Sequence, residues 1–153
     1  MQRATHRKLI CNRQLRFILM PKTLLYRLFG VGRMPAQWRT MIESEGVVLF
    51  DEGIGGSITY RDFSAPGRRS AWRKVAFSGS IALTKTRLLA LQYANPAIDV
   101  PLDDPRLKQM QFSVESEDKL LVAFNANLFH NDWSGTIEYR FRTEHAREFL
   151  KSL

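Results

Sequence analysis

The chain has 153 residues, of which 44% are hydrophobic and 25% charged, with 23 Lys and Arg against 15 Asp and Glu. This length suits one domain whose core needs no disulfide or metal, and the composition excludes a disordered, collagen-like or membrane-spanning chain. Cys11 is the only cysteine, which excludes an internal disulfide and the secreted disulfide-rich class. We therefore expect a cytoplasmic protein without metal or cofactor.

Basic residues concentrate at the start of the chain. Nine of them precede Thr40, whereas the first acidic residue is Glu43, and the remaining 14 basic residues are balanced by all 15 acids. The net charge of +8 therefore belongs to the first quarter of the chain, and the rest is close to neutral. A near-neutral body lacks the broad basic surface that nucleic acid needs, so the sequence argues against nucleic acid as a partner.

Residues 1–33 are expected to form a basic N-terminal arm, in which apolar clusters alternate with basic residues. The longest apolar run, Phe17 to Met20, is too short for a signal peptide or a membrane span. Three interpretations stay open: a transit-type or membrane-surface amphipathic segment, a flexible solvated arm, or an overlong gene start with Met20 as the initiator. Nucleic-acid binding through this arm is a further alternative, which predicts a steep salt dependence.

The second unit, residues 34–153, is expected to begin with a short helix over Met34–Glu43. Pro35 suits the first turn of this helix, and Gly46 suits its end. Its apolar residues fall on one face, which we expect to pack on the domain that follows: Met34, Trp38, Met41 and Ile42.

After Gly46 the apolar period changes from helical to two, which is typical of strands with one face in a core. Strands are expected at residues 47–50, 58–61, 74–84, 87–93, 98–102, 110–115, 120–128 and 136–142. The stretch Gly53-Ile54-Gly55-Gly56 is expected to be a turn between the first two strands. Pro101 favours an edge position for the strand that contains it.

The chain ends with an amphipathic helix, for which Thr143 is a suitable N-cap. Its apolar stripe consists of Ala146, Phe149, Leu150 and Leu153. Such a helix can cover the open end of a curved sheet. The sequence thus predicts a mainly β fold: a partly open antiparallel barrel of seven or eight strands, capped by a C-terminal α-helix and preceded by a short helical N-terminal extension.

The segment Gly79–Ala90 reads GSIALTKTRLLA: a glycine, a strand ending Leu-Thr, a turn, and Arg-Leu opening the next strand. Together with the final strand and helix, Gly135–Leu153, it resembles the pleckstrin-homology-like (PH-like) superfamily, in particular its GRAM and bacterial branch, over about residues 46–153. The resemblance implies a PH-like barrel and a non-catalytic module that binds phosphoinositides, other anionic lipids or protein partners. It also implies that Thr84 and Arg87 hold a hairpin and do no chemistry.

A basic segment, Gly67–Lys74, is the best candidate for a binding site, and we expect it to be a loop between the second and third strands. Lipid-binding PH domains usually carry basic residues one connection earlier, between their first strands. The candidate residues for an anion or lipid are Arg68, Arg69, Trp72, Arg73 and Lys74. A guanidinium group donates two parallel hydrogen bonds to the oxygens of one phosphate. A tryptophan is suited to lie at the boundary of the lipid headgroups or to stack on the face of a ring. The alternative is a solvated loop with the tryptophan tucked onto the barrel.

The partners that the sequence leaves open are an anionic membrane lipid, with peripheral attachment at a membrane, a protein partner, or a second copy in a homo-oligomer. A different class of function is an enzyme or small-molecule carrier that uses the barrel interior. The aromatic residues available to line such a pocket are Phe77, Phe112, Phe124, Tyr139 and Phe141.

The remaining motifs are interpreted as structural. Gly30-Val31-Gly32 and the loop His130–Gly135 are expected to be turns. A zinc site is not expected, because the histidines and the cysteine are scattered without ligand spacing: His6, His130, His145 and Cys11.

Overall fold

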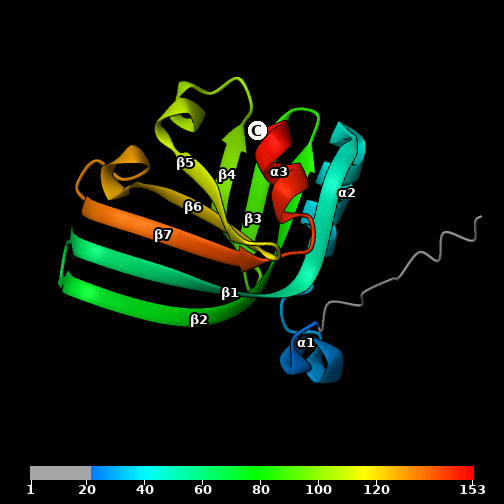
Figure 1. Ribbon diagram of the computed structural model, residues 1–153, viewed down its shortest axis with the longest axis horizontal. Helices are drawn as coiled ribbons and strands as arrows, with labels where there is room; N and C mark the ends of the chain where they lie inside the picture. The colour runs from blue at the N-terminus through cyan, green and yellow to red at the C-terminus, as the bar shows by residue number, and fades with distance from the viewer. Residues whose placement is uncertain (1–21) are drawn as a thin grey trace, which may run out of the picture.

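The structure is a computed structural model that describes residues 22–153, so the expectations for residues 1–21 lie outside the described range. The described residues form one seven-stranded antiparallel sheet with the order β4-β3-β2-β1-β7-β6-β5. The sheet is not closed, because β4 and β5 are its two edges, and Figure 1 shows it curving around the C-terminal helix α3. The mainly β antiparallel fold with a C-terminal helix is therefore confirmed.

The strands are β1 (Val47–Ala65), β2 (Arg68–Thr84), β3 (Arg87–Gln92), β4 (Asn95–Pro101), β5 (Gln111–Ser116), β6 (Lys119–Asn125) and β7 (Ser134–Arg142). The helices are α1 (Leu24–Phe29), α2 (Ala36–Glu45) and α3 (Ala146–Ser152), with short 3₁₀ helices η1 (Pro105–Gln109) and η2 (Ala126–Leu128). None of the described helices is long and apolar enough to cross a membrane.

Strand β1 combines two of the expected strands. The turn expected at Gly53–Gly56 is wrong, because these residues continue β1, and Ile54, Gly55 and Gly56 stay paired with β2. Gly53 has a φ of +68°, and the register of β1 against β2 shifts at this position, so one extra residue bulges and bends the strand. Gly56 allows a close approach to β7, since a Cβ there would stand 2.8 Å from the carbonyl oxygen of Arg140. These glycines therefore bend a strand that the sequence suggested they would end.

Other strand boundaries differ less from expectation. Strand β4 lies at an edge of the sheet, as Pro101 predicted. Strand β6 ends at Asn125, whereas the sequence predicted a strand up to Leu128. The difference arises because residues 126–128 turn into η2, which keeps Ala126 buried in the core.

The β2–β3 turn is held by Thr84 and Arg87, as the sequence predicted. The Thr84 hydroxyl oxygen accepts hydrogen bonds from the backbone N–H of Arg87 at 2.9 Å and of Thr86 at 3.2 Å. It donates to Glu45 at the end of α2, and Arg87 forms ion pairs with Glu45 and Asp99. The turn therefore fastens α2 to two hairpins.

Helix α2 covers the face of the sheet opposite to the main core. Ile42 of the helix and Met34, which precedes it, form a second cluster with the residues of β2 and β3 beneath them: Met34, Ile42, Ala82, Leu89 and Leu91, with Trp38, Met41 and Phe50 packed around them. The predicted helix face is thus confirmed, although the helix spans Ala36–Glu45 and its Pro35 is the N-cap. Because both faces are covered here, β2 and β3 are buried without alternation from Phe77 to Thr84 and from Leu88 to Leu91.

Helix α3 completes the main core. Ala146 and Phe149 are fully buried there, next to β5 and β6. Leu150 was expected in the buried stripe but is not part of it, since this residue is 39% exposed. The helix starts later than predicted, because Thr143 caps a preceding turn by accepting a hydrogen bond from the backbone N–H of His145 at 3.1 Å.

Residues 22–33, the described part of the expected arm, are hydrogen-bonded to the sheet. The backbone N–H of Thr23 donates to the carbonyl oxygen of Gly53, and the N–H of Gly53 donates to that of Gly32. Gly32 has a φ of +90° and lies on β2, where a Cβ would stand 2.6 Å from the Ser78 hydroxyl oxygen. Glu52 of β1 accepts a further hydrogen bond from the Tyr26 hydroxyl group at 3.0 Å. This part of the chain is therefore built into the fold.

Candidate functional site

The basic segment belongs to a β-hairpin. Strands β1 and β2 are joined by Pro66-Gly67, and Gly67 has a φ of +72°, a combination typical of a type II turn. The loop expected at Gly67–Lys74 is wrong, because β2 begins at Arg68 and pairs residue by residue with β1. The physical reason is that the turn needs only two residues, after which the chain can pair at once.

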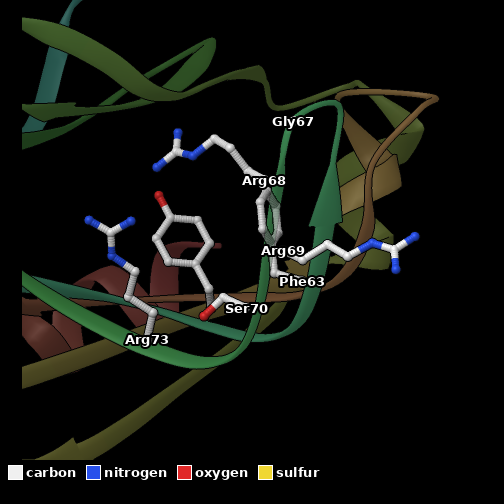
Figure 2. Close-up of a pocket in the computed structure, with 7 residues that line it drawn as sticks. Phe63, Gly67, Arg68, Arg69, Ser70 and Arg73 are labelled. Carbon is white, nitrogen blue, oxygen red and sulfur yellow. The ribbon is translucent and has the colours of Figure 1, made fainter.

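The hairpin brings three of the five candidate residues together. Arg68, Arg69 and Arg73 line a surface depression of about 240 Å³, and the other lining residues are Tyr60, Phe63, Gly67 and Ser70. In Figure 2, Arg68 and Arg73 extend to the same side of the ribbon, whereas Arg69 points away from them. Arg68 and Arg69, but not Arg73, also line an adjoining depression of about 580 Å³.

Trp72 and Lys74 lie apart from this depression. Successive side chains of a strand point to opposite faces, so these two residues face away from Arg73. Trp72 is paired with Arg61 and Lys74 with Thr59 across β1, and the Trp72 side chain is 59% exposed. Trp72, which was expected at a headgroup boundary, therefore does not line the depression with Arg68 and Arg73.

Two aromatic rings form the floor of the depression. Tyr60 and Phe63 make an edge contact with ring centres 4.9 Å apart, and Phe63 contacts Trp133 at 5.4 Å. Strand alternation would place residues 60 and 63 on opposite faces, but Asp62 has a φ of +47° and the register against β7 shifts there. Aspartate tolerates this left-handed conformation better than most residues, and it turns Phe63 inward.

The sequence analysis missed Tyr60 and Phe63. A usable signal was the dipeptide Pro66-Gly67, because a two-residue turn at this place fixes the register and sets Tyr60 opposite Arg73. The inward turn of Phe63 has no comparable signal, since it depends on the shift against β7, a strand far away in the sequence.

The charges around the hairpin are unbalanced. Arg140 of β7 forms ion pairs with Glu115 and Glu138, each at 2.9 Å, and Arg61 of β1 pairs with Glu138 at 2.7 Å. Within residues 22–153 no carboxylate forms an ion pair with Arg68, Arg69 or Arg73. Asp132 is the acidic residue that lines the adjoining depression. The hairpin therefore presents more positive than negative charge.

The other candidate motifs are placed as follows. Gly30-Val31-Gly32 forms a turn that ends α1, with Gly30 at a φ of +67°. Of the turn expected at His130–Gly135, residues 130–133 form a turn, in which the His130 and Trp133 ring centres are 3.8 Å apart, whereas Ser134 and Gly135 already belong to β7. The described residues hold no group of three His, Cys, Asp or Glu that could bind a metal, and His6 and Cys11 lie outside the described range.

Four of the five aromatic residues named for an interior pocket contact one another, and Phe112 is partly buried at the edge of the same core. Phe77 contacts Tyr139 and Phe141 edge-on, and the Tyr139 ring is stacked with Phe124 and Phe141. Burial raises the pKa of the Tyr139 hydroxyl group far above its ordinary value, so this tyrosine stays protonated. The interior pocket and the nucleic-acid-binding arm stay predictions.

Comparison of the chain with protein-family models, curated proteins and solved structures found no match.

Proposed function

We propose that the protein is a non-catalytic binding module of PH/GRAM-like type that binds a phosphate-bearing group at the β1–β2 hairpin. The observation that carries this proposal is the depression lined by Arg68, Arg69 and Arg73, none of which forms an ion pair with a carboxylate in the described part of the chain. Guanidinium groups bind phosphate oxygens through paired, charge-assisted hydrogen bonds. A phosphate group would supply the negative charge that the hairpin lacks.

The strand order supports the proposal. Because the first two expected strands are the single strand β1, the basic segment starts at the turn between the first and second strands of the sheet. This is the connection in which the PH-like resemblance implies basic residues. The sequence had suggested that the basic segment lies one connection later, between the second and third strands, and this difference from the PH-like pattern disappears.

The geometry favours Arg68 and Arg73 as the residues that bind the phosphate. They extend to the same side in Figure 2, and they line the same depression as the rings of Tyr60 and Phe63. Bound there, an inositol or sugar ring that carries the phosphate would lie over an aromatic floor. Arg69, which points away, adds positive charge to the surroundings.

Calorimetric titration of the full chain with inositol hexakisphosphate tests the site. The double variant Arg68→Gln/Arg73→Gln is expected to bind at least about tenfold more weakly, since a hydrogen bond to a charged group contributes about 1.5–3 kcal/mol. Lys74→Gln is the matched control, because it removes one charge from the other face of the same strand and is expected to change affinity little. Because the double variant removes two charges, a free-energy loss in Lys74→Gln of about half that in the double variant would mean binding to general positive charge and would overturn the site.

Vesicles separate the two sources of the phosphate. If the ligand is a lipid headgroup, vesicles that contain phosphatidylinositol phosphates should bind the wild-type chain and compete with inositol hexakisphosphate. Binding of the soluble probe without binding to these vesicles would assign the site to a free phosphate compound. Absence of binding to both would contradict the proposed function.

A further inference from the structure

Helix α1 presents the most exposed large apolar side chains of the described chain. Leu24, Leu28 and Phe29 are 73%, 71% and 75% exposed, and Leu25 is 52% exposed. Leu24 and Leu28 are four positions apart, as are Leu25 and Phe29. The four side chains therefore form one continuous face of the helix. Figure 1 shows α1 standing out at the lower right, away from the β1–β2 hairpin at the left. An exposed apolar patch of this kind marks a surface that meets a partner or a membrane.

The fold holds this apolar face outward. A helix of six residues is not stable by itself, so its orientation depends on its attachments. Thr23 caps the helix by accepting a hydrogen bond from the backbone N–H of Tyr26 at 3.1 Å, and its hydroxyl group contacts that of Ser78 at 2.9 Å. The Tyr26 ring lies directly on Gly53, where a Cβ would stand 2.3 Å from the ring. Tyr26 therefore anchors the inner side, and the leucines and phenylalanine are left to solvent.

Basic residues are interspersed with the apolar ones in this segment. Arg27 within α1 and Arg33 after it are exposed, and within residues 22–153 no carboxylate forms an ion pair with either. The Lys22 ammonium group lies over the Tyr26 ring, 4.7 Å from its centre. The sequence has no acidic residue before Glu43, and residues 1–21 add five more basic residues. The charge of this whole segment therefore complements an anionic surface, while the apolar side chains require a partner that also offers hydrocarbon.

We propose that α1 docks on an anionic lipid bilayer. The apolar face would lie at the boundary between headgroups and acyl chains, with Arg27 and Arg33 among the headgroups. A bilayer fits both features, because nucleic acid would use the cations and leave the four apolar side chains in water. This contact is separate from the phosphate site at the hairpin and does not require it.

Sedimentation with vesicles tests the proposal on the full chain. The double variant Leu28→Ser/Phe29→Ser should partition at least about tenfold less onto vesicles of phosphatidylcholine and phosphatidylserine, because the transfer of apolar area is lost. Arg27→Gln should lower partition onto these vesicles about fivefold and leave partition onto pure phosphatidylcholine unchanged. Leu150→Ser is the matched control, since it removes an exposed leucine from α3 and should change nothing. Because the substituted side chains are exposed, the variants are expected to fold like the wild type, and a thermal melt of each variant checks this.

Three results would overturn the proposal. The first is unchanged vesicle partition in the Leu28→Ser/Phe29→Ser variant, which would also be expected if another segment of the chain covers the face. The second is a wild-type dimer that the same variant converts to a monomer without vesicles, which would assign the face to a second copy. The third is equal partition of wild type onto anionic and neutral vesicles. The Leu28→Ser/Phe29→Ser variant should bind inositol hexakisphosphate as the wild type does. A negative result for α1 therefore does not contradict the hairpin site, and a negative result for the hairpin site does not contradict the membrane contact of α1.

Discussion

At the scale of single residues, Glu52 connects the segment before the sheet to β1. It accepts hydrogen bonds from the Tyr26 hydroxyl group at 3.0 Å and from the backbone N–H of Met34 at 3.1 Å, and it forms an ion pair with Arg39 at 2.6 Å. Burial by itself would raise the pKa of Glu52, but these donors and the charge of Arg39 outweigh it, so the pKa lies below its ordinary value. The ionised form is therefore favoured by folding.

Glu52→Gln should lower the free energy of unfolding by about 1–3 kcal/mol at neutral pH, because buried donors lose a charged acceptor. Since the folded pKa is lowered, the contribution of Glu52 is complete above the ordinary glutamate pKa and is lost as the pH falls through the folded value. Denaturant unfolding of both proteins across this acidic range measures the difference. Glu117→Gln is the control, with a side chain that is 91% exposed. A difference that stayed constant down to the lowest pH would contradict this account.

At the scale of elements, the bulge at Gly53 both bends β1 and receives α1. The backbone N–H of Gly53 donates to the carbonyl oxygen of Gly32, and its own carbonyl oxygen accepts from Thr23. The absence of a side chain leaves room for the Tyr26 ring. A strand irregularity thereby becomes the docking point for a helix that precedes the sheet.

Gly53→Ala and Gly67→Ala form a matched pair. Both glycines have a φ near +70°, but a Cβ on Gly67 meets nothing within 4 Å, whereas one on Gly53 collides with the Tyr26 ring. Gly67→Ala should therefore cost only the backbone strain of about 1 kcal/mol. Gly53→Ala should cost clearly more and accelerate hydrogen exchange in residues 22–33. Equal destabilisation, or unchanged exchange in this segment, would show that Tyr26 is not held there.

At the scale of the whole molecule, α3 completes a sheet that does not close on itself. Phe149 is fully buried in the main core, while its neighbour Leu150 is 39% exposed. Six of the seven strands contribute residues to the same cluster as Phe149 from both halves of the sheet, among them Ile58, Leu88 and Leu120. The helix is therefore part of one cooperative core.

Phe149→Ala should destabilise the protein by about 3–5 kcal/mol, because it leaves a cavity where the helix meets the sheet. Leu150→Ala should change the free energy of unfolding by less than about 1 kcal/mol, as at other surface positions. Denaturant unfolding followed by circular dichroism measures both values. Two separate transitions in wild type, with α3 lost first, would contradict a shared core.

Sequence alone was sufficient where the structure depends on local pattern. The alternation around Tyr139, the apolar face of Trp38 and Ile42, and the Thr84–Arg87 turn each involve residues that are close in the chain. Period two and period 3.6 distinguish strand from helix without reference to any partner. The class of fold and its closing helix were therefore predictable.

The tertiary structure decided what depends on distant partners. Glycine is compatible with a turn and with a bulge, and only pairing with β2 and β7 makes Gly53–Gly56 part of β1. The same long-range pairing turns Phe63 inward, separates Trp72 from Arg73 and leaves Leu150 at the surface. Residues 22–33 dock on β1 through backbone hydrogen bonds, and the apolar face of α1 is exposed. Composition determined that this segment is basic and apolar, whereas the bend in β1 determined which of its side chains meet the solvent.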